Sequence, residues 1–258
     1  MRKIIKKVSI VIPAFNEEKL IARCLKSLCE QTMKREEYEI IVVNNNSTDK
    51  TEEIAKKYAD KVIFEKRQGQ LFARQTGFEV AEAEIILRTD ADCIVPKNWV
   101  KKGYNFLHKN KKIVAVSGFY YPDNNDFGLI YFSWFTIQYK TIIYKITEKV
   151  EWLTSSCSGI KKSAFLKIGG FDLKQDVVIE DQLGIGYRLN KVGKVAFDKD
   201  WFVWTSPRRV VARKNSGLKE FMNDYLLYQI YNNFYFYLFK KRPRKIYGKG
   251  WENIRENE

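Results

Sequence analysis

Short apolar runs alternate with stretches of helical periodicity through the N-terminal part of the chain. β-branched residues dominate the runs, which is typical of buried strands, and these runs cover residues 8–13, 38–43, 62–64 and 84–88. Between them the apolar residues recur at helical spacing, over residues 17–30, 51–59 and 72–83. Strand and helix signals alternate about four times, which predicts a βαβ arrangement: a mainly parallel sheet with helices on both faces.

The rhythm changes after Pro96. Residues 112–119 are predicted to form another strand, 127–146 an aromatic amphipathic stretch, 155–205 short strands with one helix, and 216–240 a helix rich in Tyr and Phe. We therefore expect one α/β domain over residues 1–210, with halves 1–95 and 96–210. An amphipathic, aromatic and basic helical segment is expected over 211–258.

Composition adds a strong positive charge to this picture. The chain has 258 residues, 45% of them hydrophobic, and a formal net charge of +15. The apolar share excludes a disordered chain, and 14 Gly with 5 Pro and no repeat exclude collagen-like and low-complexity classes. Such a charge indicates an anionic partner: nucleic acid, a membrane surface or a phosphorylated small molecule.

Cysteines and terminal signals indicate a reducing compartment. The four cysteines form no CxxC pair and no zinc spacing, so we expect free, mostly buried thiols. The run after the basic N-terminus meets Asn16-Glu17-Glu18 without a small-residue cleavage site, which favours a strand over an export signal. No apolar stretch of about 20 residues predicts a membrane-spanning helix.

Polar residues follow three of the predicted strands. Asn16 and Glu17 follow the first, 44–46 end the second, and Asp90-Ala91-Asp92 follows the fourth. Since ligands of open α/β sheets bind beyond the carboxyl ends of the strands, we expect these groups to converge at one edge. Two carboxylates two residues apart suit a divalent cation that also binds a diphosphate.

These motifs together resemble a known family. The segments 8–18, 41–49, 90–92 and 169–172, followed by Glu180-Asp181, are similar in order and spacing to family 2 glycosyltransferases, over roughly residues 8–205. The resemblance implies the GT-A fold, with a Rossmann-like sheet. It further implies an inverting, hexosyltransferase-type enzyme that moves a sugar from a nucleoside diphosphate sugar to an acceptor hydroxyl with Mg²⁺ or Mn²⁺.

The resemblance also assigns roles to individual residues. It implies Asp181 as the catalytic base, Asp92 as the metal ligand, and Asp172 and Glu180 on the acceptor side. Some family members place a further metal-ligand His after the base; this chain has none there, and we expect Arg208 and Arg209 nearby to act as a diphosphate clamp instead. The half 1–95 would then bind the nucleotide sugar and 96–210 the acceptor. The donor residues would be Pro13, Ala14, Asn16, Glu17, Asn44, Asn46, Gly69, Arg74 and Asp90.

Several of these positions carry a structural alternative. Asn44 stands where the family has an Asp that holds the base, which leaves the base open. Arg74 is equally compatible with an exposed helix position, and Glu180 with a structural role at a helix start. The arginines at 208–209 also suit a solvated basic loop. Asp49 is expected to cap the next helix rather than touch ligand.

Two aromatic stretches lie outside these motifs. In 127–146, one helical face gathers Phe132, Phe135, Tyr139, Ile142, Ile143 and Ile146, and we expect it to pack on the core, with a membrane interface as the alternative. The aromatic residues 225–239 precede the basic run 240–245, which favours an anchor on an anionic cytoplasmic leaflet over a docked terminal helix. We therefore predict a cytoplasmic protein, peripheral at the inner membrane face, acting on a glycan or polyprenyl-linked acceptor.

Two other functions compete with this one. A basic nucleic-acid-binding protein would carry a recognition fold, and no helix-turn-helix, zinc or RNA-recognition pattern is present, so no nucleic acid is expected as a partner. A catalytically inactive nucleotide-binding scaffold is supported only by Asn44, because Asp90, Asp92 and Asp181 are all present.

Overall fold

The structure is a computed structural model that describes residues 5–123, 127–148, 150, 152–174, 180 and 184–208. Nearly all of these residues belong to one compact unit, Met1–Ser206. The segment 211–258, expected to be helical, lies outside the described residues.

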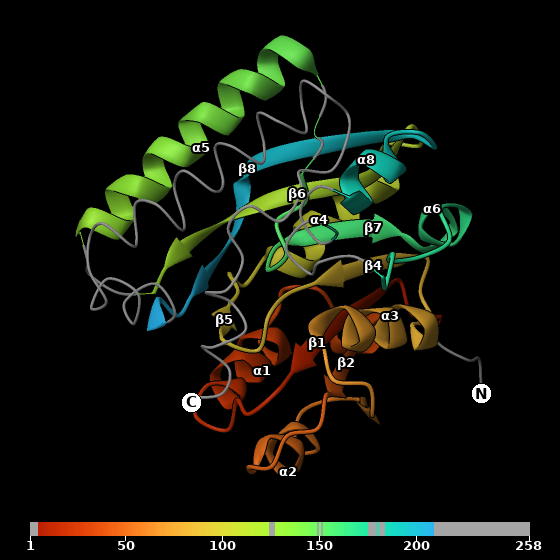
Figure 1. Cartoon of the computed structure of the whole chain (residues 1–258), viewed down its shortest axis with the longest axis vertical. Helices are drawn as coiled ribbons and strands as arrows, with labels where there is room; N and C mark the ends of the chain where they lie inside the picture. Colours follow the sequence, from red (N-terminus) through yellow and green to blue (C-terminus); the bar gives the residue numbers. More distant parts are fainter. Residues whose placement is uncertain are drawn as a thin grey trace. The chain divides into compact units, whose positions relative to one another are not determined.

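An eight-stranded sheet forms the centre of this unit, in the order β3-β2-β1-β4-β7-β6-β8-β5 (Figure 1). Strands β1 to β4 pair in parallel, as do β6 and β8, whereas β7 runs antiparallel to β4 and β6, and β5 antiparallel to β8. The sheet is therefore mainly parallel, as predicted. The strands are β1 (Val8–Ala14), β2 (Tyr38–Asn44), β3 (Lys61–Phe64), β4 (Ile85–Arg88), β5 (Cys93–Ile94), β6 (Ile113–Pro122), β7 (Ser158–Lys161) and β8 (Lys194–Thr205).

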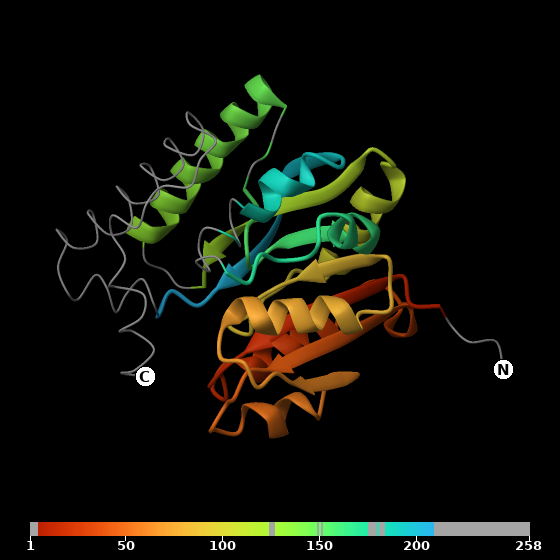
Figure 2. The ribbon, with the colours of Figure 1, turned by 45° about the vertical axis from the view of Figure 1, so that its right-hand side comes forward.

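Helices cover both faces of the sheet, which confirms the βαβ prediction. One face packs against α1 (Ile21–Cys29), α2 (Thr51–Ala55) and α4 (Trp99–Lys109). The other packs against α3 (Gln70–Val80), α5 (Phe127–Thr147), α6 (Lys162–Lys167) and α8 (Ile185–Leu189). A short 3₁₀ helix, η1 (Arg35–Glu37), precedes β2. Figure 2 shows α3 lying across β1 and β2.

The strands are continuous apolar runs because both of their faces are covered. In β1, Ile10 and Ile12 join the core under α1 and α2, while Val11 between them joins the core under α3. Gly77 brings α3 close to this strand: a Cβ there would lie 2.3 Å from Cγ1 of Val11. Close packing at this point fixes the height of α3 above β1.

Helix α5 packs on the sheet with the side opposite to the one expected. Ser133 and Ile137 are buried, and the Tyr144 ring meets Phe197 of β8 at a centroid distance of 6.3 Å. Four members of the stripe that we expected to face the core are instead exposed: Phe135, Tyr139, Ile142 and Ile146. Both sides of this helix are apolar, so the spacing alone does not determine which side turns inward.

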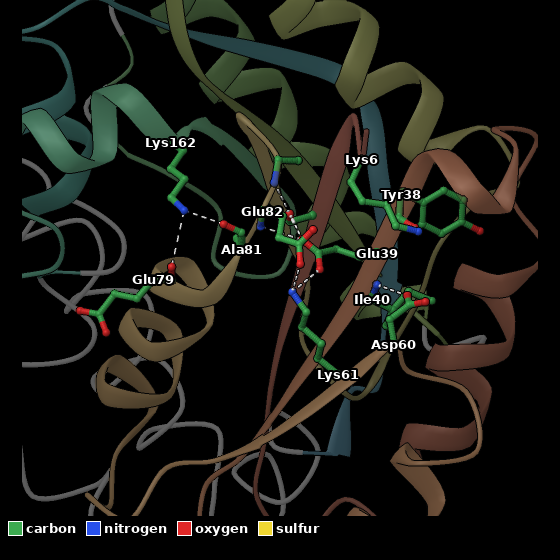
Figure 3. A network of polar contacts seen from close by, with 12 residues as sticks. Lys6, Tyr38, Glu39, Ile40, Asp60, Lys61, Glu79, Ala81, Glu82 and Lys162 are labelled. Carbon is green, nitrogen blue, oxygen red and sulfur yellow. Dashed lines mark hydrogen bonds and ion pairs between the residues drawn. The ribbon is translucent and has the colours of Figure 1, made fainter. Parts of the chain in front are cut away.

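A polar network ties together the amino ends of the strands, at the opposite end of the sheet from the loops that follow β1, β2 and β4 (Figure 3). The Glu39 carboxylate in β2 is 2% exposed and accepts hydrogen bonds from Ser9 Oγ of β1 (2.5 Å) and from the Glu82 amide (2.8 Å). Lys61 Nζ of β3 lies 2.9 Å from Glu39 Oε2 and 2.7 Å from Glu82 Oε1. The network joins three neighbouring strands to the loop that follows α3.

We predict that Lys61→Met destabilises the fold by about 1–3 kcal/mol, because it leaves the buried Glu39 carboxylate without this cation. Water that reaches the site from the Lys61 side limits the loss. Denaturant unfolding measures the change. Lys57→Met, which removes the exposed ion pair with Glu53, is the control and should shift stability by less than about 0.5 kcal/mol. Equal effects of the two substitutions would contradict the structural importance of the network.

Candidate functional site

The polar motifs converge where the parallel strands β1, β2 and β4 end. The Asn45 amide donates to the Ala14 carbonyl (2.9 Å), and the Thr89 amide donates to the Val11 carbonyl (3.3 Å). The loops that follow the three strands are therefore joined at one edge, as the sequence predicted. Pro13 and Ala14 are the last residues of β1, and both are buried.

The loop after β1 is bonded to the loop after β2. Asn16 has a positive φ of 52°; its amide donates to Ser47 Oγ (3.1 Å), and its Oδ1 accepts from the Thr48 amide (2.9 Å). The Glu17 amide donates to Thr51 Oγ1 (2.7 Å), and the Glu17 side chain is buried. These contacts hold Asn16 and Glu17 at the edge of the sheet.

Asp49 caps the following helix, as expected. Its carboxylate accepts from the amides of Thr51 (2.9 Å), the first residue of α2, and Glu18 (3.0 Å). Partial burial opposes ionisation of this carboxyl, but the hydrogen bonds outweigh it and lower its pKa. The carboxylate therefore stays charged and holds the two loops together.

The three consecutive asparagines after β2 use their side-chain amides within the protein. Asn44 Nδ2 donates to Glu52 Oε2 (2.7 Å), and Asn46 Nδ2 donates to the Glu65 and Lys66 carbonyls (3.2 and 3.1 Å). Asn45 donates to the Glu65 and Arg67 carbonyls. The contribution of Asn45 was missed from the sequence, where only its neighbours on either side became candidates.

The loop of residues 65–69 is built by these asparagines and by one ion pair. Arg67 donates to both carboxylate oxygens of Glu65, which with a hydrogen bond from Thr76 lowers the pKa of Glu65 to about 2. Gly69, the residue before α3, has a φ of 140°, a positive value that strains other residues, and its amide donates to Asn45 Oδ1 (2.8 Å). The backbone therefore enters α3 along a fixed path.

Arg74 joins α3 to the acidic motif. Its guanidinium is fully buried, and one nitrogen lies 2.9 Å from Oδ1 of the partly exposed Asp90. The alternative of an exposed helix residue is therefore wrong. The pair fixes the Asp90 carboxylate at the end of β4 and places a buried positive charge beside it.

Asp92 is held by the end of β8, which is distant in the sequence. Its Oδ1 accepts from Thr205 Oγ1 (3.4 Å), and its carbonyl accepts from the Ser206 amide (3.2 Å). Cys24 and Cys93 lie buried beside the acidic motif, and burial together with the nearby Asp92 and Asp90 raises the pKa of both thiols. These thiols therefore stay protonated.

The donor set suits a hard divalent cation. Asp90 and Asp92 offer oxygen ligands, and the described part of the chain holds no group of three or more His, Cys, Asp and Glu residues that would form a complete protein cage. Mg²⁺ is commonly bound by one or two carboxylates together with substrate phosphates. The two aspartates therefore fit a cation whose remaining ligands come from a bound diphosphate.

A glycine turn that follows α6 packs against Gln75 of α3. Gly169 and Gly170 have φ values of 78° and 75°, and a Cβ on Gly170 would lie 2.6 Å from Gln75 Oε1. The same oxygen accepts from the Phe171 amide (3.0 Å). Because Gln75 follows Arg74, α3 holds both Asp90 and the turn that carries Asp172.

Glu180 and Arg188 fix the other side of this turn. Glu180 is fully buried, pairs with Arg188 and accepts from the Asp172 amide (3.0 Å). Arg188 also donates to the Ile168 and Gly170 carbonyls (3.0 and 2.7 Å). Burial raises the pKa of Glu180, against the opposing effect of the Asp172 amide and Arg188. These contacts give Glu180 the structural role that we weighed for it.

Arg88 is a further residue that the sequence analysis missed. It ends β4, is fully buried, donates from Nε to Ser158 Oγ of β7, and lies 5.8 Å from the Phe171 ring centroid. In the sequence, Arg88 stood out only as a charged residue at the end of an apolar run. Arg188 gave no signal, because its partners Glu180, Gly170 and Ile168 stand at no regular helical or strand spacing from it.

The structure does not place the remaining candidates at this site. Asp181 and Arg209 lie outside the described residues. Arg208 is half-buried and belongs to the second compact unit, Pro207–Glu258. His108 is exposed and stacks on Tyr104.

Comparison with known proteins adds a family match. Residues 9–169 match the family model "Glycosyl transferase family 2". Glycosyltransferase AglE of Haloferax volcanii is 32% identical over 147 residues, which cover 54% of this chain and 48% of AglE. The poly(ribitol-phosphate) beta-N-acetylglucosaminyltransferase TarS of Staphylococcus aureus is 31% identical over 121 residues, which cover 43% of this chain and 21% of TarS. The chain thus aligns with less than half of the length of these two relatives.

Solved structures share the fold. TarS residues 1–349 in complex with UDP-GlcNAc match with a TM-score of 0.60 and 21% identity over 78% of this chain and 58% of that one. The mannosyltransferase PcManGT from Pyrobaculum calidifontis, in complex with GDP-Man and Mn²⁺, matches with a TM-score of 0.58 and 20% identity, over 78% of this chain and 56% of that one. At these identities the likeness concerns the fold.

We predict that Arg188→Met destabilises the protein by about 2–3 kcal/mol, because the buried Glu180 loses its cation and two carbonyls lose a donor. Hydrogen exchange of the Asp172 amide should accelerate by more than exchange in β1. Lys191→Met, which removes an exposed cation over the Tyr187 ring, is the matched control. Unchanged exchange at Asp172 would show that Arg188 does not hold the turn.

Proposed function

The chain belongs to glycosyl transferase family 2, and from this premise we propose that it transfers a sugar from a nucleoside diphosphate sugar to an acceptor hydroxyl, with inversion at the anomeric carbon. The fold is of the GT-A type, as the resemblance implied. The observation that carries the proposal is the buried Arg74–Asp90 pair with Asp92 at the carboxyl edge of β4, where this fold class binds its ligands.

The donor is proposed to lie over the joined loops of β1, β2 and β4. Pro13, Ala14, Asn16 and Glu17 would border the nucleoside, and Asp90 would contact the ribose. Gly69 and Arg74 would face the diphosphate, where a fixed backbone bend and a guanidinium favour phosphate oxygens. Because Asn44 and Asn46 donate within the protein, we assign them to shaping the loops around the base.

Asp92 is proposed as the protein ligand of a Mg²⁺ or Mn²⁺ ion, with Asp90 beside it. When bound, such an ion neutralises the diphosphate and stabilises the charge that develops on the leaving group. The proposal is supported by the oxygen donors at the end of β4 and by the Mn²⁺ and GDP-Man bound to PcManGT. The contact of Arg208 and Arg209 with the diphosphate stays a prediction from the sequence.

Asp181 is proposed as the general base. Its carboxylate would take the proton of the acceptor hydroxyl while the acceptor oxygen bonds to the anomeric carbon, and the nucleoside diphosphate would leave with the electron pair. Glu180, next to it in the chain, is anchored by Arg188 and the Asp172 amide. Asp172 is proposed to border the acceptor.

The acceptor is proposed to be a growing cell-envelope glycan or a polyprenyl-linked carrier. TarS, whose name gives it a poly(ribitol-phosphate) acceptor, supports the first class. Among the described residues, no helix combines the length and the apolar character needed to cross a bilayer. We propose peripheral contact with the inner face of the membrane. The aromatic and basic residues 221–245, the first candidate for this contact, lie outside the described residues.

We predict that Asp92→Ala weakens Mn²⁺-dependent binding of the donor by about tenfold or more, because a carboxylate ligand is lost. Thermal shift with UDP- and GDP-linked sugars, with Mn²⁺ and with a chelator, measures the loss of donor binding. The same screen identifies the nucleobase of the donor. Asp200→Asn, at an exposed position paired with Lys199, is the control. If the wild-type shift is the same in chelator, or is absent with every donor, the metal role or the donor class is wrong.

To test the general base, we predict that Asp181→Asn lowers the rate of transfer by about 10²–10⁴-fold, because proton removal from the acceptor is lost while the donor still binds. Release of nucleoside diphosphate measures turnover, and thermal shift measures donor binding. Near-normal turnover of this variant would assign the base to another residue. Donor binding with no turnover in the wild-type protein would support the inactive scaffold instead.

A further inference from the structure

The outer face of α5 is mainly apolar, with Gln138 and Lys145 as the polar residues exposed among its apolar side chains. We define this face by six exposed residues: Tyr131, Trp134, Phe135, Tyr139, Ile142 and Ile146. Their spacing of three or four residues places them on adjacent turns of one side of the helix. The exposed fractions run from 51% at Trp134 to 74% at Ile146, which is far above the few per cent of core residues.

The fold does not use this face to hold the helix. On the opposite side Ser133 and Ile137 are buried, and Tyr144 contacts Phe197. The Lys140 ammonium also lies on the inner side, 5.7 Å from the Phe119 ring centroid and 5.5 Å from that of Trp152. The six outer residues therefore remain available to another surface, and an apolar stripe of this extent usually marks an interaction site.

Charge and residue type indicate what that surface is. Residues 127–147 contain no Asp or Glu, Lys145 is exposed, and the chain as a whole carries +15. Trp and Tyr, which combine an apolar ring with a polar group, are enriched where a bilayer meets water. A helix with aromatic residues on one side and no carboxylate fits the headgroup region of an anionic membrane.

The helix is suited to lie on a bilayer rather than to cross it. It has 21 residues, so it is about 30 Å long, but its polar and charged residues leave it too little apolar to cross a membrane. Its inner side packs against β6 and β8 (Figure 1). Only the outer face would therefore enter the lipid.

The start of helix α5 lies close in the chain to the sheet edge that carries the candidate site. Strand β6 ends at Pro122, whose partner in β8 is Thr205, and Thr205 Oγ1 donates to Asp92 Oδ1. The chain enters α5 at Phe127, shortly after this edge. A surface bound by the N-terminal half of the helix thus adjoins the same edge as the two aspartates.

We propose that the outer face of α5 docks in the headgroup region of an anionic membrane, with the helix axis in the plane of the bilayer. This deepens the proposed function and rests on it for the acceptor: docking presents the site edge to acceptors held at the membrane. The lipid contact itself is independent of transfer, so the two can fail separately.

Vesicle binding of the full chain tests the proposal, with phosphatidylcholine vesicles that contain or lack phosphatidylglycerol. We expect the wild-type protein to sediment with the anionic vesicles. The double substitution F135S/I142S should weaken this binding by about tenfold or more, since each side chain loses apolar area that enters the lipid. Phe64→Ser is the matched control, because Phe64 of β3 is 61% exposed and Phe135 is 59% exposed. It should bind as the wild type does.

Other outcomes would overturn the proposal. Binding lost in K240E/K241E but kept in F135S/I142S would move the contact to the C-terminal segment. Absence of vesicle binding, with a smaller oligomer for F135S/I142S in size-exclusion chromatography, would assign the face to a second copy of the chain. Thermal shift with donor and Mn²⁺ should be unchanged in F135S/I142S. A wild-type protein that binds vesicles but no donor would overturn the proposed function and leave the docking face standing.

Discussion

The buried ion pair between Arg74 and Asp90 is the interaction on which the architecture of the site depends. A fully buried guanidinium requires a nearby anion, and Asp90 supplies it at the end of β4. This contact fixes α3 relative to the acidic motif. The next residue, Gln75, then holds the Gly169-Gly170 turn, so one helix sets the distance between Asp90 and this turn.

The loops around this pair are shaped before any ligand arrives. Asn44 and Asn46 each donate to neighbouring segments, and Asn45 both donates and accepts. The Glu180–Arg188 ion pair likewise shapes the Gly169-Gly170 turn. Charged and amide groups that are already bonded lose little conformational freedom when a substrate binds, so more of the interaction energy contributes to affinity.

The sequence predicted the parallel part of the fold well, because strands buried on both faces, such as β1 and β2, leave continuous apolar runs. It also placed Asn16, Asn44 and Asp90 at a common edge, since parallel strands end together. It did not predict the roles of Arg188 and Thr205, whose partners Glu180 and Asp92 are brought close only by the tertiary fold. The prediction of which side of α5 faces the core was wrong, because that helix is apolar on both sides. The role of Asp181 remains a prediction.

The two borders of the sheet are short. The outermost strands are β3, with four residues, and β5, with two, and the first of them begins with the charged Lys61. A border strand of this length offers few free backbone groups to a strand from another molecule. The described sheet therefore presents little surface for edge-to-edge pairing with a strand of another molecule.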